Sequence, residues 1–205
     1  YQNKGGEDIA VENELNLLKE VFEVETLFFS NNIVNYFLEF FSFIFNRNIK
    51  NQRLLNQKIS EFQPDIVYVH NTWFAASLGI FHVLNKRNVK VLLKLHNLRF
   101  NCTRTYLSKK HFKNDNTCLC CGKKREDLGF FNKYFEESFL KSLYVTRYGK
   151  KYFKILNEMD LTILVLTSFH KNFLESLNIK NKIEICPNYI DVTKNTVKRK
   201  NLPYL

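Results

Sequence analysis

The fold is decided by two short runs of sequence, DIVYVHN at residues 65–71 and VKVLLKLHN at residues 89–97. Each run is nearly continuous in apolar residues, and each ends in His-Asn. Such runs are typical of strands that are buried on both faces of a sheet. Three further runs, at residues 24–29, 161–165 and 182–185, have a similar character. The sequence therefore predicts strands in all five places.

Helical periodicity fills the gaps between these runs. One helix is expected to start near Glu7, a second to start near Trp73 with residue 71 or 72 as its cap, and a third to follow a cap at Ser168 and end near Asn178. Alternation of strands and helices predicts an α/β fold with a doubly wound parallel sheet, covered by helices on both faces. Ligands bind such sheets beyond the carboxyl ends of the strands.

Composition sets the limits of this interpretation. The chain has 205 residues and a mass of 24.5 kDa, with 45% hydrophobic and 25% charged residues, which suits one sizeable domain or at most two small ones. Its net charge of +11 suits an anionic partner, although compositional drift is an alternative explanation. Five cysteines make a disulfide framework improbable and favour a reducing compartment. The longest apolar-rich stretch, residues 33–45, is too short and too polar to span a bilayer.

The two ends of the chain suggest domain boundaries. Gly5-Gly6 enters the first helix after only four residues, so we expect the sheet to lack its first strand. Residues 194–205 begin with a basic, polar stretch that is typical of a linker. We therefore predict one domain at residues 1–193, truncated at its N-terminus, followed by a basic linker at 194–205.

Polar residues at the ends of strands are the first candidates for a site. His70-Asn71 and His96-Asn97 follow consecutive strands and are expected to lie at the rim where the sheet binds ligands. For His70 we favour a structural role, and for His96, which precedes a long polar loop, a functional one. Gly5-Gly6 is either a phosphate cradle or a simple helix entry, and Glu7 and Asp8 favour the second interpretation.

Two other segments carry a structural and a functional interpretation each. Cys102, Cys118 and Cys121, with His111 or Cys120, could supply four zinc ligands, but the chain has no second C-x-x-C, and free or packed thiols are the alternative. Residues 33–45 form a Phe-rich amphipathic stretch near Arg47, Lys50 and Arg53. This stretch is either a helix that faces the core or an interfacial helix that docks on a membrane.

Six segments in order resemble the N-terminal domain of family 4 glycosyltransferases, which are retaining, nucleotide-sugar-dependent enzymes of the GT-B fold. They are residues 5–8, 64–71, 95–102, 118–121, 167–169 and 186–191. The resemblance implies two Rossmann-like domains that face each other across a cleft. The N-terminal domain, half of the GT-B architecture, mainly holds the acceptor, and the C-terminal domain holds the nucleotide-sugar.

The resemblance also implies roles for individual residues. Gly5 and Gly6 would form the loop toward the donor diphosphate, and His96 would lie beside the transferred sugar and the reacting centre. Asn188 would lie at the exit toward the second domain. The side chains expected to line the acceptor site are His70, Asn71, Asn97 and Arg99. The chemistry requires no metal ion or other cofactor, and the nucleotide-sugar is a co-substrate.

We therefore expect the acceptor-binding half of a bacterial glycosyltransferase for cell-surface polysaccharide, lipopolysaccharide or other glycolipid assembly, inactive without the donor-binding domain. The expected location is the cytoplasm, with peripheral contact to the anionic inner face of the membrane. One alternative is a non-catalytic partner subunit of a split transferase. The other is a basic nucleic-acid-binding module, which is disfavoured because the basic residues are dispersed and no RNP, helix-turn-helix or KH pattern is present. We therefore expect no nucleic-acid partner.

Overall fold

A computed structural model describes residues 6–29, 45–70, 72, 76–98 and 139–189, which form an α/β fold. The helices are α1 (Gly6–Lys19), α3 (Ile49–Phe62), α4 (Gly79–Arg87), α7 (Phe139–Glu158) and α8 (Ser168–Ser176). The strands are β1 (Ile66–Val69), β2 (Lys90–Leu95), β3 (Thr162–Val165) and β4 (Ile183–Ile185). The described residues thus confirm four of the five predicted strands and the predicted fold class.

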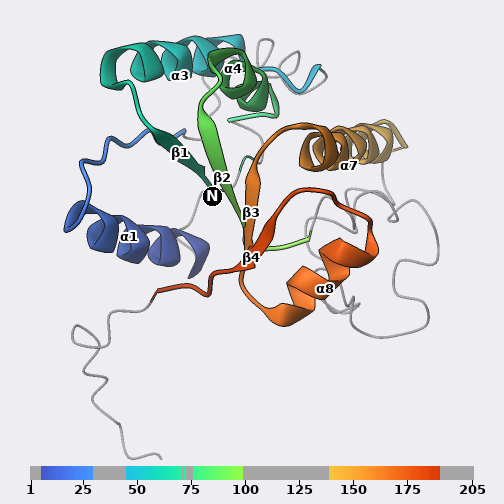
Figure 1. Cartoon of the computed structure of the whole chain (residues 1–205). Coiled ribbons are helices and arrows are strands. Elements are labelled where there is room, and N and C mark those ends of the chain that lie inside the picture. Colours follow the sequence, from blue (N-terminus) through green and yellow to red (C-terminus); the bar gives the residue numbers. More distant parts are fainter. Residues whose placement is uncertain (1–5, 30–44, 71, 73–75, 99–138, 190–205) are drawn as a thin grey trace, which may run out of the picture.

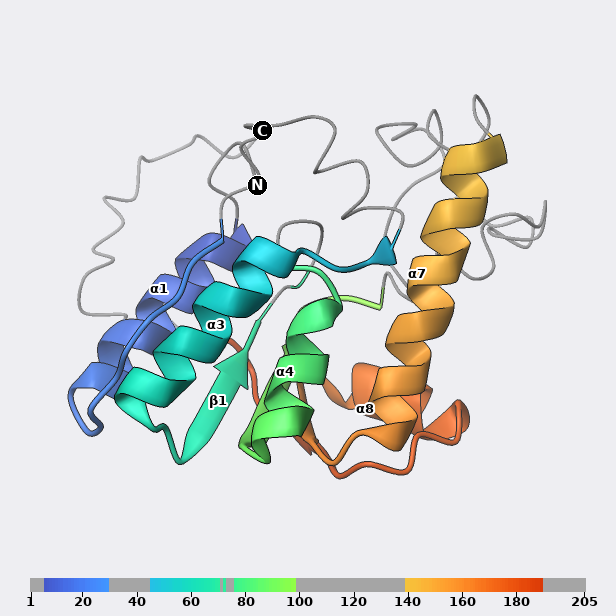
Figure 2. The same cartoon turned by 90° about the horizontal axis from the view of Figure 1, so that it is seen from above.

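The four strands form one parallel sheet in the order β1-β2-β3-β4. Figure 1 shows α1 on one face of this sheet and α3, α4 and α7 on the opposite face. Seen from above, α3, α4 and α7 lie in a row across the sheet (Figure 2). The three-layer arrangement that the alternation of strands and helices predicts is therefore present.

The two faces of the sheet differ in chemistry. On β2 and β3, alternate aliphatic side chains are buried in one hydrophobic core with residues of α3, α4 and α7. The strand and helix residues of this core include Val91, Leu93, Leu95, Ile163, Val165, Leu55, Ile59, Phe81, Leu84 and Leu156. On the opposite face β1 and β2 carry Tyr68 and Lys94. The residues of β2 after Lys90 are buried or half-buried on both faces, as predicted, whereas β1 is only partly buried. The layer under α1 is polar rather than apolar.

The predicted strand at residues 24–29 is also wrong. These residues belong to no helix or strand and pair with no strand among the described residues. Leu27 and Phe29 pack against the core, whereas Phe28 is 68% exposed. The apolar alternation therefore places side chains on the correct face, but a strand also needs a neighbouring backbone to complete its ladder.

Helix α4 begins later than the sequence predicts. The expected start was Trp73, but the helix begins at Gly79. Ser77, just before it, has a φ of 59°, which is incompatible with an α-helix, and its hydroxyl accepts hydrogen bonds from the backbone N–H of Asn48 (3.0 Å) and of Gly79 (3.3 Å). Residues 76–78 therefore form a turn that is hydrogen-bonded to the start of α3, and helix α4 begins after that turn.

The remaining helix predictions differ in outcome. Helix α1 is confirmed near Glu7. Helix α8 is confirmed, but its cap is Thr167 rather than Ser168, since the Thr167 hydroxyl accepts the N–H of His170 at 3.3 Å. Asn178 follows this helix in the left-handed conformation (φ 56°) that is typical of a helix end. Helices α3 and α7 were not predicted from the sequence.

Several sequence predictions lie outside the described residues. They concern Gly5, Asn71, Arg99, the cysteine segment 102–121, nearly all of the Phe-rich stretch 33–45, and the linker 194–205. Among the helices that the structure describes, none combines the length and the apolar character needed to cross a membrane.

Candidate functional site

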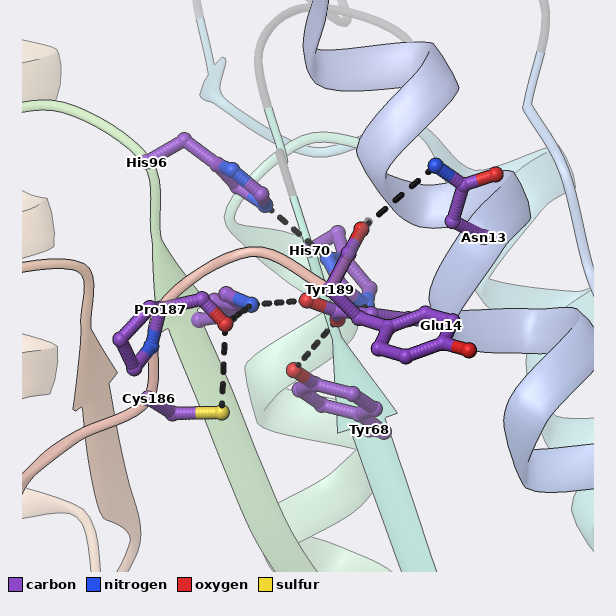
Figure 3. Close-up of polar contacts among 9 residues, drawn as sticks. Asn13, Glu14, Tyr68, His70, His96, Cys186, Pro187 and Tyr189 are labelled. Atoms are coloured by element: carbon purple, nitrogen blue, oxygen red, sulfur yellow. Dashed lines mark hydrogen bonds and ion pairs between the residues drawn. The ribbon is translucent and has the colours of Figure 1, made fainter. Parts of the chain in front are cut away.

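Two histidines meet at the carboxyl edge of the sheet. His70 directly follows β1 and His96 directly follows β2, and these two strands are neighbours. The Nδ1 atom of His70 lies 3.1 Å from the Nε2 atom of His96, which is a hydrogen-bond distance, and the ring centroids are 5.4 Å apart. Figure 3 shows this contact between the two side chains as a dashed line beside α1. The structure therefore brings together the two His-Asn positions that the sequence indicated.

A buried carboxylate on α1, that of Glu14, lies next to the histidine pair. Glu14 is 7% exposed, and its Oε2 atom accepts a hydrogen bond from the Tyr68 hydroxyl at 3.0 Å. The same oxygen lies 4.0 Å from Nε2 of His70. The Nζ atom of Lys94, which is 1% exposed, donates to the other oxygen, Oε1. Glu14 is therefore the centre of a network that joins α1 to both strands.

The chain segment after β4 lies over the same network. The Cys186 N–H donates to the Val165 carbonyl at 2.7 Å, which extends the sheet contact by one residue. The Pro187 carbonyl then accepts a hydrogen bond from Lys94 Nζ at 3.4 Å, and the Tyr189 carbonyl accepts one from the Asn13 side chain at 3.5 Å (Figure 3). The exit from β4 is thus held against α1 and β2.

The pKa values of both imidazoles are lowered, so that neither ring readily takes up a second proton. Burial lowers the pKa of His70 to about 4, repulsion from His96 lowers it too, and the Glu14 carboxylate opposes both effects. Burial also lowers the pKa of His96 to about 4, with the Lys94 charge acting in the same direction and Glu14 against it. Both rings are therefore neutral at neutral pH, and each has one N–H donor and one acceptor nitrogen.

The Tyr68 hydroxyl stays protonated. Burial raises its pKa, and so do the charge of Glu14 and the hydrogen bond to it. Tyr68 therefore acts as a fixed hydrogen-bond donor to Glu14, and its ring lies 4.3 Å from the His70 ring between centroids. The site thus combines one buried ion pair, one phenol and two neutral imidazoles.

The other predicted site residues have different surroundings. Gly6 is the first residue of α1, and Asn97 lies half-buried next to His96. Asn188 is half-buried after β4, and its Oδ1 atom finds no hydrogen-bond partner in the described part of the chain. Within that part, no group of three or more His, Cys, Asp or Glu side chains is arranged to hold a metal ion.

The sequence analysis missed Glu14, Tyr68 and Lys94. Lys94 did leave a signal, because a lysine inside a buried strand needs a partner of opposite charge. Its partner, Glu14, is 80 residues away in sequence and looks like an ordinary polar position of an amphipathic helix. Nothing in the local pattern could have paired the two.

Comparison with known proteins gives one match. The family model described as Glycosyltransferase Family 4 matches residues 21–194, which include His70, His96 and Asn188. Searches of the curated proteins and of the solved structures found no match. The matched segment covers most of the chain and contains all four strands. The chain therefore belongs to glycosyltransferase family 4.

Proposed function

We propose that this chain is the acceptor-side half of a retaining glycosyltransferase, which transfers a sugar from a nucleotide-sugar to a cell-surface glycan or glycolipid. Membership of the family supports glycosyl transfer as the general activity. The observation that carries the finer proposal is the pair of neutral imidazoles at the carboxyl edge of a parallel sheet. Sugars present hydroxyl groups, and neutral imidazoles offer both a donor and an acceptor to them.

The low basicity of His96 supports a binding role. A general base works best when its pKa lies near the operating pH, and the pKa of His96 is about 4. We therefore assign His96 to holding the sugar near the reacting centre. The acceptor proton goes instead to the leaving diphosphate, as the bond from the sugar to that diphosphate breaks and the bond to the acceptor oxygen forms on the same face.

The start of α1 supports a role near the diphosphate. Backbone N–H groups at a helix N-terminus attract anions, and α1 begins at Gly6. Stabilising the negative charge that develops on the leaving group is the main catalytic task in such a reaction. Glu7 and Asp8 in the first turn weaken this attraction, so we assign most of the donor affinity to a second domain.

We further propose that the 205-residue chain transfers no sugar unless that donor-binding domain is supplied. The purified chain, given candidate nucleotide-sugars and acceptors, is expected to release no nucleotide and to form no glycoside. The same assay after addition of the donor-binding domain provides the positive control. Measurable transfer by the chain alone would show that the donor site lies within these residues.

The role of His96 is tested by substitution in the complete enzyme. We expect His96→Ala to lower turnover by more than about tenfold, which corresponds to about 1.4 kcal/mol of barrier, without loss of circular dichroism. His82→Ala is the matched control, because His82 lies exposed on α4 and outside the network. Unchanged turnover in His96→Ala would remove His96 from the site.

A further inference from the structure

We propose that Glu14 and His70 are positioning residues that fix the tautomer of His96. In this arrangement His70 carries its proton on Nε2, next to Glu14, and its Nδ1 accepts a hydrogen bond from the Nε2–H of His96. The Nδ1 atom of His96 then has no proton and is left as an acceptor. The statement about tautomers rests on the geometry and on the neutrality of the two buried rings, and only its use by a sugar hydroxyl rests on the proposed function.

The first step follows from the contact between the rings. Two nitrogens that lie 3.1 Å apart form a hydrogen bond only if one carries a proton and the other does not. Because burial keeps both rings neutral, each has a single N–H. Two arrangements are therefore possible, and they differ in which ring is the donor.

Glu14 decides between these two arrangements. Its Oε2 atom lies 4.0 Å from Nε2 of His70, on the side of the ring that faces away from His96. A proton on Nε2 is attracted by the carboxylate, whereas a lone pair there would face a negative charge. The Tyr68 hydroxyl is already committed to Oε2 at 3.0 Å. His70 is therefore protonated at Nε2, which makes its Nδ1 the acceptor.

Lys94 keeps Glu14 in this position. Its ammonium group donates to Oε1 of Glu14 and, at 3.4 Å, to the Pro187 carbonyl. The carboxylate is thus held by donors from β1 and β2, and the imidazole pair receives its orientation from α1. The charged and titratable groups that act on the pair or on its supports are Glu14, Tyr68, Lys94 and Cys186.

The arrangement has a consequence for ligands. A group that binds to Nδ1 of His96 has to donate a hydrogen bond, as the hydroxyl of a sugar or of another polyol does. A carbonyl or ether oxygen in that place would face the lone pair of His96. The tautomer therefore selects a hydrogen-bond donor at this point of the site, a requirement that sugar hydroxyls meet, which deepens the proposed function without depending on the identity of the sugar.

The test is long-range ¹H–¹⁵N NMR spectroscopy of the whole chain at neutral pH, with the five histidines assigned by single substitutions. We expect His70 and His96 each to be protonated at Nε2 and not at Nδ1. Protonation of His96 at Nδ1, or a doubly protonated ring at pH 7, would overturn the proposal. The measurement needs no substrate, so its failure is distinct from a failure of the proposed function.

Variants of His70 separate positioning from packing. The side-chain oxygen of an asparagine can take the place of Nδ1, so His70→Asn is expected to keep His96 in its single tautomer. His70→Leu offers no acceptor, and His96 is then expected to populate both tautomers. If His70→Leu left the tautomer of His96 unchanged, His70 would not position it.

A double substitution tests the role of Glu14. Glu14→Gln with Lys94→Met removes the carboxylate without leaving a buried cation behind. We expect both histidines then to lose their preference for a single tautomer. An unchanged spectrum in a folded double variant would show that Glu14 does not set the tautomer.

Discussion

Lys94 has its ammonium group buried at 1% exposure within a strand, and Glu14 balances its charge. Removing one member of a buried ion pair leaves an uncompensated charge in the interior, which costs about 3–5 kcal/mol. We therefore expect Glu14→Met to lower the free energy of unfolding by that amount in urea titrations. The variant Glu14→Met/Lys94→Met is expected to recover all but about 1 kcal/mol, which reflects the Tyr68 hydroxyl left without its acceptor. A double variant as unstable as the single one would contradict this account of the pair.

The histidine pair makes the protein sensitive to acid. The folded-state pKa values of His70 and His96, about 4, lie below the ordinary value of about 6.5, so the unfolded chain binds more protons between these pH values. The free energy of unfolding therefore keeps its full value, as far as these two histidines are concerned, above about pH 6.5. It decreases as the pH falls toward 4. Allowing for their partial exposure, we expect the pair to lose about 2–3 kcal/mol between pH 7 and pH 5.

Urea unfolding curves at these two pH values measure this loss. The variant His70→Gln/His96→Gln should show a flatter dependence of unfolding free energy on pH, whereas His82→Gln should behave as the wild type, because His82 is exposed on α4. If the double variant kept the full dependence on pH, its source would lie elsewhere.

At the scale of elements, α8 depends on a side-chain cap. The Thr167 hydroxyl accepts the N–H of His170, which would otherwise be one of the unpaired donors in the first turn. Thr167→Ala is expected to cost about 1 kcal/mol of unfolding free energy, measured by thermal or urea denaturation. Thr167→Ser keeps a hydroxyl in the same place and should lose little. Equal losses in both variants would mean that the methyl group, and not the hydroxyl, matters.

The elements also show how far the sequence could be used for prediction. Continuous apolar runs located β1 to β4, because a buried strand needs apolar residues at successive positions. The same reasoning failed at residues 24–29, since ladder formation depends on a partner strand that the local sequence does not specify. Helical periodicity likewise gave the wrong start for α4, because Ser77 adopts a positive φ that few serines adopt.

The residues of the site also fall into those that the sequence could predict and those that it could not. His70 and His96 could be found because each directly follows a predicted strand, and the carboxyl ends of parallel strands meet at one edge. Glu14 could not be found, because it lies on helix α1, far from His70 in sequence, and approaches it across the face of the sheet. Contacts between layers depend on tertiary packing, to which periodicity within one element is insensitive.

At the scale of the whole molecule, the net charge of +11 suggests association with an anionic membrane surface. Arg47, Lys50 and Arg53 are exposed around the start of α3, next to Ile49, which is 62% exposed. Each basic residue near an anionic surface contributes about 1 kcal/mol. We therefore expect Arg47→Glu/Lys50→Glu/Arg53→Glu to weaken binding to vesicles of anionic lipid by about a hundredfold or more in sedimentation assays.

A matched control has the same change in net charge elsewhere. Lys86→Glu/Lys90→Glu/Lys180→Glu reverses three exposed charges at other places on the surface and should weaken binding far less. If both triple variants lost the same affinity, the attraction would be generic to the charge of the chain. Vesicles of neutral lipid should bind neither variant nor the wild type.

The sheet has a further consequence for how the protein is made. Its strands lie side by side in the order in which they occur along the chain. During synthesis on the ribosome, each new strand after β1 therefore emerges when its neighbour has already been translated. Domains in general begin to fold from their N-terminal end as they are made. Growth of this sheet can thus proceed in one direction, and a nascent chain that stalls after β3 would lack β4, helix α8 and the segment after β4 that contacts Lys94 and Asn13.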